Sequence, residues 1–256
     1  MACNGVDLVI HSAALKHVPV CEYNTEEAIS TNITGSLNIA KAAHAQKVKH
    51  LVCLSTDKAV DPINLYGATK MCLEKAVLNY RFMSASETIY SVVRYGNVIA
   101  SRGSLIEKLL DTSQFPSITN PDMTRFWMRI EDSIDLVRKS LELDTTGIVI
   151  VPHMKSLSIA KTFEYLRPEL IGKELGSRVG EKKHECILSD SERHLAFSCK
   201  EFTLINASDS KYIDKTVKAY GLKPVNEEKY CSCETERFNQ EDFKKLVTNT
   251  IINELT

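Results

Sequence analysis

The sequence has no excess of charge of either sign. Its 32 Lys and Arg residues nearly balance its 33 Asp and Glu residues, which leaves a formal net charge of −1 at pH 7. It also has no block of like charges, although proteins that bind nucleic acid or anionic membrane surfaces usually carry one. We therefore expect a small molecule, rather than nucleic acid, as the partner of this protein.

Long apolar runs are also lacking. No stretch approaches the roughly 18 apolar residues that a membrane-spanning helix needs. The first residues, MACNGVDLV, lack the basic start and apolar centre of a signal peptide. With 43% hydrophobic and 25% charged residues, the composition is that of an ordinary globular protein. The sequence predicts a cytoplasmic protein without a membrane partner.

The eight cysteines lack the spacing of a metal site. Cys231 and Cys233 lie close together, but a zinc site usually has two ligand pairs, each with roughly two to four intervening residues. His184, Cys186 and His194 do not supply a second such pair. We predict that no metal is bound and that the cysteines are mostly small buried hydrophobic residues of a protein in a reducing compartment.

Alternating strand and helix patterns fill the first half of the chain. Apolar, β-branched and aromatic residues indicate strands that begin near Val6 and cover 50–55 and 90–98. Apolar residues recur at helical spacing after Asn24 and from Leu65. Strands that alternate with helices form parallel sheets through right-handed crossovers. The predicted fold class is therefore α/β, with a Rossmann-like doubly wound parallel sheet.

Beyond the third strand the pattern loosens, and one more helix and strand then follow before about residue 153. We assign residues 1–98 and 128–153 to the C-terminal part of a dinucleotide-binding domain. Residues 99–127 and 154–256 are predicted to form a smaller mixed α/β lobe that binds the substrate.

A glycine-rich turn is the absence with the largest consequence. Dinucleotide-binding sheets usually begin with a strand, a glycine-rich turn and a helix whose amino end holds the pyrophosphate. None of the ten glycines lies in such a motif. The sequence thus predicts a sheet that lacks its first βαβ units and has an open apolar edge, which would promote aggregation.

Tyr66 and Lys70 lie four residues apart, on one face of a predicted helix. An ammonium group beside a phenol favours the phenolate and lowers the pKa of the tyrosine, which can then act as a base. The spacing alone is more typical of a solvated helix surface. The preceding strand, however, ends at Ser55 and Thr56. Hydroxyl groups and the phenol therefore converge at the carboxyl edge of the sheet, where such folds bind ligands.

Several stretches, in their order and spacing, closely resemble the inverting UDP-N-acetylglucosamine 4,6-dehydratases, a family of short-chain dehydrogenases/reductases. These stretches are HSAALKHVP, STDKAVDPINLYGATK, VVRYGNV, SRGS, MTRFW and RVGEKKHE. The resemblance covers about residues 5–184. It implies a hydro-lyase of polysaccharide biosynthesis that opens the pseudaminic acid pathway for bacterial surface sugars, here N-terminally truncated.

In that family, bound NADP⁺ takes hydride from C4 of the sugar, water is eliminated across C5 and C6, and the hydride returns to C6. The resemblance therefore implies UDP-N-acetylglucosamine as substrate, NADP as cofactor with NAD as the alternative, and a homo-oligomer. A dehydratase needs a base at C5 and an acid at C6 in addition to the groups of a simple dehydrogenase. Asp57 and Lys58 match the family's positions for these two groups.

The resemblance implies a role for each matching residue. Tyr66 would be the base at the C4 hydroxyl, Lys70 would lower its pKa and hold the nicotinamide ribose, and Thr56 would bond near the reacting oxygen. Asp57 would be the acid at C6 and Lys58 the base at C5. The implied cofactor-binding residues are Ser12, Ala13, Ser55, Tyr66, Lys70, Tyr95 and Val98. The implied substrate-binding residues are Lys16 and Asn97 for the sugar, Arg125 and Arg178 for the diphosphate, and Glu181 for a ribose hydroxyl.

Two substitutions depart from the family pattern. Ala100 stands where the family usually has Gly, and Val179 stands where it usually has Pro. Ala100 would crowd a close approach of the backbone. Tyr66 matches the short soluble members, because the long membrane-anchored relatives usually carry Met there. Asn32 resembles the helix asparagine that connects the sheet with the active site in many short-chain dehydrogenases.

Two other functions stay open. A nucleotide-sugar epimerase would use Tyr66 and Lys70 but would give Asp57 and Lys58 no clear role. The second alternative is a truncated, non-catalytic chain that binds a nucleotide sugar or a partner subunit. Members of the family carry the glycine-rich turn ahead of the part that matches here. We therefore predict that the natural active protein is longer and that this chain alone is inactive or nearly so.

Overall fold

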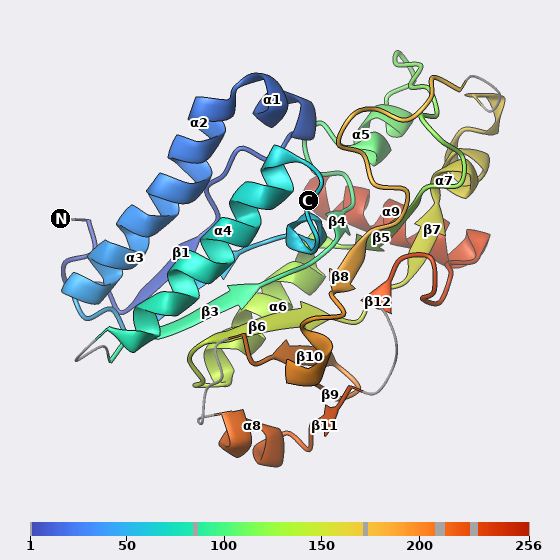
Figure 1. Cartoon of the computed structure of the whole chain (residues 1–256). Coiled ribbons are helices and arrows are strands. Elements are labelled where there is room, and N and C mark those ends of the chain that lie inside the picture. Colours follow the sequence, from blue (N-terminus) through green and yellow to red (C-terminus); the bar gives the residue numbers. More distant parts are fainter. Residues whose placement is uncertain (1, 84–86, 171–173, 208–212, 226–229, 256) are drawn as a thin grey trace. The chain divides into compact units, whose positions relative to one another are not determined.

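The computed structural model describes residues 2–83, 87–170, 174–207, 213–225 and 230–255 (Figure 1). The chain forms two compact units. The first unit comprises residues 1–95, 135–153 and 187–229, and the second comprises residues 96–134, 154–186 and 230–256.

A seven-stranded sheet forms the centre of the first unit, in the order β1-β2-β3-β6-β10-β9-β11. The neighbours β1, β2, β3 and β6 are parallel, and the remaining strands pair antiparallel. This arrangement confirms the predicted α/β fold with a parallel sheet. The strands are β1 (Leu8–His11), β2 (His50–Leu54), β3 (Ile89–Val93), β6 (Ile148–Pro152), β9 (Ala196–Ser198), β10 (Phe202–Ile205) and β11 (Lys223–Pro224).

Helices pack against this sheet, and α3 and α4 lie side by side (Figure 1). The longer of these two helices, α4, begins where the sequence provides a cap: Asn64 Oδ1 accepts a hydrogen bond from Gly67 N at 2.8 Å. The helical segments are α1 (Val18–Tyr23), α2 (Thr25–Ile29), the π-helical turn η1 (Ser30–Thr34), α3 (Gly35–Ala45), the 3₁₀ turns η2 (Asp57–Ala59), η3 (Tyr80–Phe82) and η5 (Arg193–Leu195), α4 (Leu65–Asn79) and α8 (Ile213–Ala219). α6 (Ile130–Glu142) has residues in both units.

The apolar core of the first unit explains why the inner strands read as continuous hydrophobic runs. Val52, Val93 and Ile150, from three adjacent parallel strands, pack with Leu204 of β10 and Leu136 of α6. Parallel strands are covered on both faces, so their side chains are buried on both sides. The edge strand β1 differs, because its Leu8 and Ile10 are 40% and 48% exposed. The apolar edge predicted for the first strand is therefore present in the structure.

The second unit is built on a three-stranded sheet in the order β4-β5-β7. Its core contains Trp127, Phe163 and Phe243, and the ring of Trp127 meets that of Phe243 edge to face at 6.1 Å. The elements of this unit are β4 (Asn97–Val98), α5 (Leu105–Leu110), β5 (Thr124–Met128), β7 (Ser156–Ser158), α7 (Ile159–Leu166), η4 (Pro168–Leu170) and α9 (Gln240–Leu255). The strands β8 (Cys186–Leu188) and β12 (Tyr230–Cys231) pair with each other.

The observed division of the chain differs from the predicted one. Residues 187–229 were expected in the substrate lobe, but they lie in the first unit. The reason is that β10 pairs with β6 along the edge of the parallel sheet, and β9 and β11 extend it further. The first segment also ends at residue 95 rather than at 98. An antiparallel strand can join a parallel sheet from a distant part of the sequence, so the alternating pattern of the first half does not reveal these additions.

The cysteines divide into two groups. Cys21 and Cys53 are free and buried, as expected of small hydrophobic residues. Cys186 and Cys231, however, form a disulfide across a sequence separation of 45. The expectation that the cysteines are mostly small buried hydrophobic residues does not hold for this pair. Within the described ranges, no helix is both long and apolar enough to cross a membrane.

Candidate functional site

Three side chains on one face of α4 contact the carboxyl end of β2. Tyr66, at 8% exposure, shares a hydrogen bond with the Thr56 side chain. Lys70 Nζ donates a hydrogen bond to the carbonyl oxygen of Leu54 at 2.6 Å. One turn further on, Glu74 Oε1 accepts from Ser55 Oγ at 2.5 Å. These three helix residues are spaced four apart and so lie on one face of α4. Each contacts one of the three consecutive residues 54–56, where the chain leaves the sheet.

Asp57 and Lys58 form a hydrogen-bonded ion pair directly after this strand. Lys58 Nζ lies 2.9 Å from Asp57 Oδ1, which also accepts from Thr56 Oγ1 at 3.0 Å. Asp57 is fully buried, and its Oδ2 has no hydrogen-bond partner in the described part of the chain. A buried carboxylate oxygen without a partner is costly in a folded protein, and such groups are often reserved for a ligand or a reaction. The backbone holds the pair in place, because Asp57 N donates to Tyr95 O at 2.9 Å.

Gly67 allows α4 to approach this turn closely. A Cβ atom at position 67 would lie 2.1 Å from the carbonyl oxygen of Lys58 and 3.1 Å from Pro62 Cβ. Any other residue would push the helix away from the turn. The glycine that follows Tyr66 therefore sets the distance between the tyrosine and the Asp57–Lys58 pair.

Burial dominates the protonation of the tyrosine and the lysine. It raises the pKa of Tyr66 far above its ordinary value, and the hydrogen bond with Thr56 opposes this change only in part. The predicted lowering of the Tyr66 pKa by Lys70 is thus wrong, because Lys70 is not among the groups that shift it. Burial lowers the pKa of Lys70 itself to about 8, against the opposing influence of Cys53 and Glu74.

Asn32 connects the segment after β1 with α4. Its Oδ1 accepts from Leu15 N at 2.8 Å, and its Nδ2 donates to Leu15 O at 3.0 Å and to Thr69 Oγ1 at 2.9 Å. It is fully buried in the π-helical turn η1. Such turns widen a helix locally and often occur at functional sites. The expected connecting asparagine is therefore present, with Thr69 as its contact on the helix that carries Lys70.

The other predicted residues of the first unit lie at the carboxyl ends of strands. Ser12 and Ala13 follow β1 and are exposed, as is Lys16. Tyr95 follows β3, and burial raises its pKa. Ser55 is buried and bonded to Glu74 rather than open to a ligand. Val98, predicted with this group, lies on β4 in the second unit.

The second unit contains a cavity of about 500 Å³, within the usual size range of small-molecule sites. The four predicted substrate residues of this unit, Asn97, Arg125, Arg178 and Glu181, all line it. Lys108 and Trp127 are also in its wall. The structure thus brings together side chains from positions up to 84 residues apart, since the first of the four is at 97 and the last at 181.

Arg125 is a buried cation without a carboxylate partner among the described residues. It is 7% exposed, and its NH groups donate to the carbonyl oxygens of Thr124, Lys182 and Lys183 at 2.8 to 3.2 Å. Carbonyl oxygens leave the positive charge uncompensated, which favours an anion in the cavity. Glu181, which also lines the cavity, accepts from Thr119 Oγ1 at 3.4 Å and from Arg178 N at 3.1 Å.

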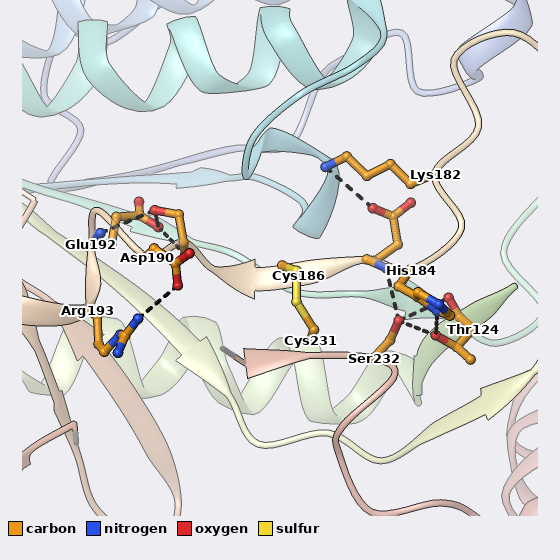
Figure 2. The surroundings of a disulfide bond; sticks show 11 residues. Thr124, Lys182, His184, Cys186, Asp190, Glu192, Arg193, Cys231 and Ser232 are labelled. Carbon is orange, nitrogen blue, oxygen red and sulfur yellow. Dashed lines mark hydrogen bonds and ion pairs between the residues drawn. A yellow bond between two sulfur atoms is a disulfide. The ribbon is translucent and has the colours of Figure 1, made fainter. Parts of the chain in front are cut away.

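A segment after Glu181 is fixed to β5 and β12 by several contacts (Figure 2). His184 Nδ1 and Thr124 Oγ1 lie 2.8 Å apart, Thr124 Oγ1 and Ser232 Oγ lie 2.6 Å apart, and Glu185 N donates to Ser232 Oγ at 2.9 Å. The Cys186–Cys231 disulfide closes this arrangement (Figure 2). The segment that carries Lys182 and Lys183, whose carbonyls hold Arg125, is therefore anchored by both hydrogen bonds and a covalent link.

Several of these residues were not found by sequence reasoning. Glu74 could have been found, because it continues the fourfold spacing of Tyr66 and Lys70. Ser232 and the disulfide had no signal in their spacing, since their partners lie far away in the sequence. Cys186 and Cys231, two of the residues considered and rejected as zinc ligands, form a disulfide with each other, which their spacing did not indicate.

The family model described as "Polysaccharide biosynthesis protein" matches residues 1–207. The inverting UDP-N-acetylglucosamine 4,6-dehydratase of Campylobacter jejuni serotype O:2 is 40% identical over an alignment of 232 positions, which covers 87% of this chain and 69% of that protein. The UDP-glucose 4-epimerase of Rickettsia bellii strain RML369-C is 38% identical over an alignment of 265 positions, which covers 97% of this chain and 75% of that protein. The relatives thus include both a dehydratase and an epimerase.

Solved structures agree with this kinship. Pen from Bacillus thuringiensis superimposes with a TM-score of 0.88 and 31% identity, and covers 98% of this chain and 77% of its own. The dTDP-glucose 4,6-dehydratase DesIV from Streptomyces venezuelae, solved with NAD and TYD bound, shares the fold with a TM-score of 0.66 at 14% identity, covering 99% of this chain and 76% of its own. The chain belongs to the polysaccharide biosynthesis protein family of short-chain dehydrogenases/reductases.

Proposed function

We propose that this protein has the activity of an inverting UDP-N-acetylglucosamine 4,6-dehydratase, a redox-neutral hydro-lyase of surface polysaccharide or flagellin sugar biosynthesis. The observation that carries this proposal is the ion pair between the fully buried Asp57 and the half-buried Lys58, beside Thr56 and Tyr66. An epimerase needs only the proton and hydride transfer at C4. A dehydratase must also remove a proton from C5 and protonate the hydroxyl that leaves from C6, and this pair offers a base and an acid for these steps.

Tyr66 is proposed to take the proton of the C4 hydroxyl, with Thr56 bonded to the same phenolic oxygen. The oxidised nicotinamide, when bound, accepts hydride from C4 and adds a positive charge that favours the phenolate. Lys70 has one described acceptor, the carbonyl of Leu54, and an ammonium group has three N–H donors. It can therefore also hold the hydroxyl groups of a nicotinamide ribose.

Once C4 is a ketone, the proton on C5 is acidic. Lys58 is proposed to take this proton, and Asp57 to give a proton to the C6 hydroxyl, which leaves as water while the C5–C6 double bond forms. The pair must react with Lys58 neutral and Asp57 protonated. Transfer of one proton over the 2.9 Å hydrogen bond from Lys58 to Asp57 produces this form.

The cavity of the second unit is proposed to bind the nucleotide diphosphate. Arg125 and Arg178 supply cations for the phosphates, since a guanidinium matches phosphate oxygens in a bidentate way. Glu181 is proposed to accept a hydrogen bond from a ribose hydroxyl, and Asn97 and Lys16 to contact the sugar. The relative with UDP-N-acetylglucosamine in its name has 40% identity, which supports this choice of nucleotide sugar.

NADP is the proposed cofactor, with NAD as the alternative. The residues present fit the nicotinamide half: Tyr66 and Lys70 lie where the ribose and ring would be held, and Ser12, Ala13 and Tyr95 follow neighbouring strands. The pyrophosphate half has no glycine-rich turn in the 256 residues. We propose a cytoplasmic homo-oligomer, and we expect the cofactor affinity of this chain to be low.

Product mass separates the proposed reaction from its alternatives. With UDP-N-acetylglucosamine and a large excess of NADP, a dehydratase gives a product lighter by one water, whereas an epimerase gives an isomer of unchanged mass. A non-catalytic chain binds UDP-N-acetylglucosamine without turning it over, and titration calorimetry detects this binding. Conversion to an isomer without loss of water would reject the proposed function.

A further inference from the structure

The first unit contains a buried cluster of charged residues that has no role in the proposed reaction. It includes Glu74 of α4, the helix that also carries Tyr66 and Lys70. Arg94 is 2% exposed, and all five of its N–H donors are used. Its Nε and NH2 donate to the two carboxylate oxygens of Glu74 at 3.1 and 2.6 Å, and NH1 and NH2 donate to those of Glu192 at 3.0 and 2.8 Å. The fifth bond goes to Ile187 O at 3.0 Å.

The two carboxylates of this cluster differ in what else they contact. Glu74 lies on α4 and accepts from Ser55 Oγ at 2.5 Å. Glu192 instead accepts from Ser189 N and Oγ, at 3.1 and 3.0 Å, in a turn of its own. Only Glu74 thus connects the arginine with the strand end that carries Thr56, Asp57 and Lys58. A buried ion pair is weak evidence for stability on its own, so its geometry needs a further explanation.

Arg94 lies between the two residues whose carbonyl groups bind the backbone of residues 55–57. The carbonyl of the preceding residue, Val93, accepts from Ser55 N at 2.7 Å, and the carbonyl of the following residue, Tyr95, accepts from Asp57 N at 2.9 Å. The two neighbours of Arg94 in the chain therefore bind the backbone of the residues on either side of Thr56. Glu74 connects α4 to Arg94 itself. Tyr66, Lys70 and Glu74 together set the register of the helix against residues 54–56.

Charge balance gives the cluster a second connection with the site. Two carboxylates and one guanidinium sum to −1, and Lys70, one turn before Glu74, brings the compensating positive charge. The titratable groups with an electrostatic effect on Lys70, or affected by it, are Glu74 on its own helix, Cys53 on β2 and His11 on β1. Of these three groups, Glu74 is the carboxyl group, and it lies one helical turn from Lys70.

We propose that Glu74 is a positioning residue for the Tyr66–Lys70 pair, holding α4 against residues 54–56 and supplying the negative charge that keeps Lys70 protonated. This inference rests on the proposed function for the roles of Tyr66 and Lys70. Arg94 orients the Glu74 carboxylate, and Glu192 completes the coordination of Arg94 without contributing to the site.

The test compares Glu74→Gln with Glu192→Gln, because each removes one negative charge from the same guanidinium and only the first touches α4 and Ser55. The first readout needs no turnover. In protein labelled with ¹³C at lysine Cε, the signal of Lys70, identified by its loss in Lys70→Arg, is followed against pH. The midpoint is expected near pH 8 in the parent chain. It is expected to fall in Glu74→Gln and to stay unchanged in Glu192→Gln.

The second readout is turnover of UDP-N-acetylglucosamine. We expect kcat to fall at least about tenfold in Glu74→Gln with little change in KM, and to fall much less in Glu192→Gln. If both variants leave the Lys70 midpoint at the parent value, the proposal is wrong. If the parent chain shows no turnover, as its low expected cofactor affinity allows, the Lys70 titration alone decides the charge contribution of Glu74.

Should Glu74→Gln fail to fold, Glu74→Asp keeps the charge and shortens the reach to Ser55. It is expected to retain the Lys70 midpoint and to lower kcat, whereas Glu192→Asp retains both. A Lys70 midpoint that moves equally in the two aspartate variants would also overturn the proposal.

Discussion

The backbone of Gly67 faces the carbonyl oxygen of Lys58 so closely that a Cβ atom would lie 2.1 Å from that oxygen. Gly67→Ala must therefore move α4 away from the turn that carries Asp57 and Lys58. We expect a loss of about 1–3 kcal/mol in the free energy of unfolding, by analogy with overpacked cores, together with a large loss of activity. Urea unfolding and product formation measure the two effects.

Gly35→Ala is the matched control for this substitution. Gly35 begins α3, and its added Cβ would meet only Ser30 O, at an ordinary 3.6 Å. The change is expected to stabilise the protein by about 0.5–1 kcal/mol, because alanine has a higher helix propensity. Equal effects of the two substitutions would show that the contact between Gly67 and Lys58 does not matter.

Ala100 has a φ of 57°, in the left-handed region that favours glycine. The departure from the family's glycine thus has a cost in backbone strain rather than in crowding alone. Ala100→Gly is expected to raise the free energy of unfolding by about 1 kcal/mol. In the interior of α3, where the backbone is helical, Ala42→Gly should lower it by about as much. If Ala100→Gly destabilised the protein, the backbone at Ala100 would not be strained as we expect.

Lys70 gives the stability a specific dependence on pH. Its pKa is about 8 in the folded chain, below the ordinary value of 10.5, so the unfolded chain binds more protons between these two values. Stability contributed through Lys70 must therefore rise with pH in this window. The difference in unfolding free energy between the parent and Lys70→Met is expected to increase from pH 8 to about pH 10 and to be flat below pH 7. A constant difference in urea titrations across this range would be inconsistent with the lowered pKa.

The disulfide between Cys186 and Cys231 closes a loop over a sequence separation of 45. Cys231→Ser is expected to lower the free energy of unfolding by about 2–4 kcal/mol under oxidising conditions, because the unfolded chain gains freedom. Cys233→Ser, at a free cysteine two residues away, should have little effect. Since the segment before Cys186 carries the carbonyls that hold Arg125, Cys231→Ser should also weaken UDP binding. Identical unfolding with and without reductant would contradict this assignment.

The local part of the site follows from the sequence, because it depends on short spacings. Tyr66 and Lys70 share a helix face at four residues apart, and Thr56, Asp57 and Lys58 are adjacent in the chain, so a correct strand and helix bring them together. Asn32 reaches Thr69 over 37 residues, and only the resemblance to a family indicated this connection.

Contacts between distant residues and the burial of individual side chains could not be predicted from the sequence. Arg94 and Glu192 are 98 residues apart, and β10 pairs antiparallel with β6 although elements of the second unit, including α7, lie between them in the sequence. The pKa of Tyr66 was predicted in the wrong direction because the spacing reveals the nearby lysine but not the loss of solvent around the phenol. Desolvation depends on everything that packs around a group, and no local pattern contains that information.

The central claim is that Lys58 removes the C5 proton and Asp57 protonates the leaving hydroxyl. The most direct measurement supplies UDP-4-keto-N-acetylglucosamine in D₂O without cofactor and follows the sugar by NMR and mass spectrometry. We expect the parent chain to exchange the C5 proton and to eliminate water faster than a protein-free solution. Asp57→Asn should lose the elimination and slow the exchange, because Lys58 then has no carboxylate to take its proton, and Lys58→Met should lose both. Exchange at C5 in Lys58→Met at the rate of the parent chain would contradict the account.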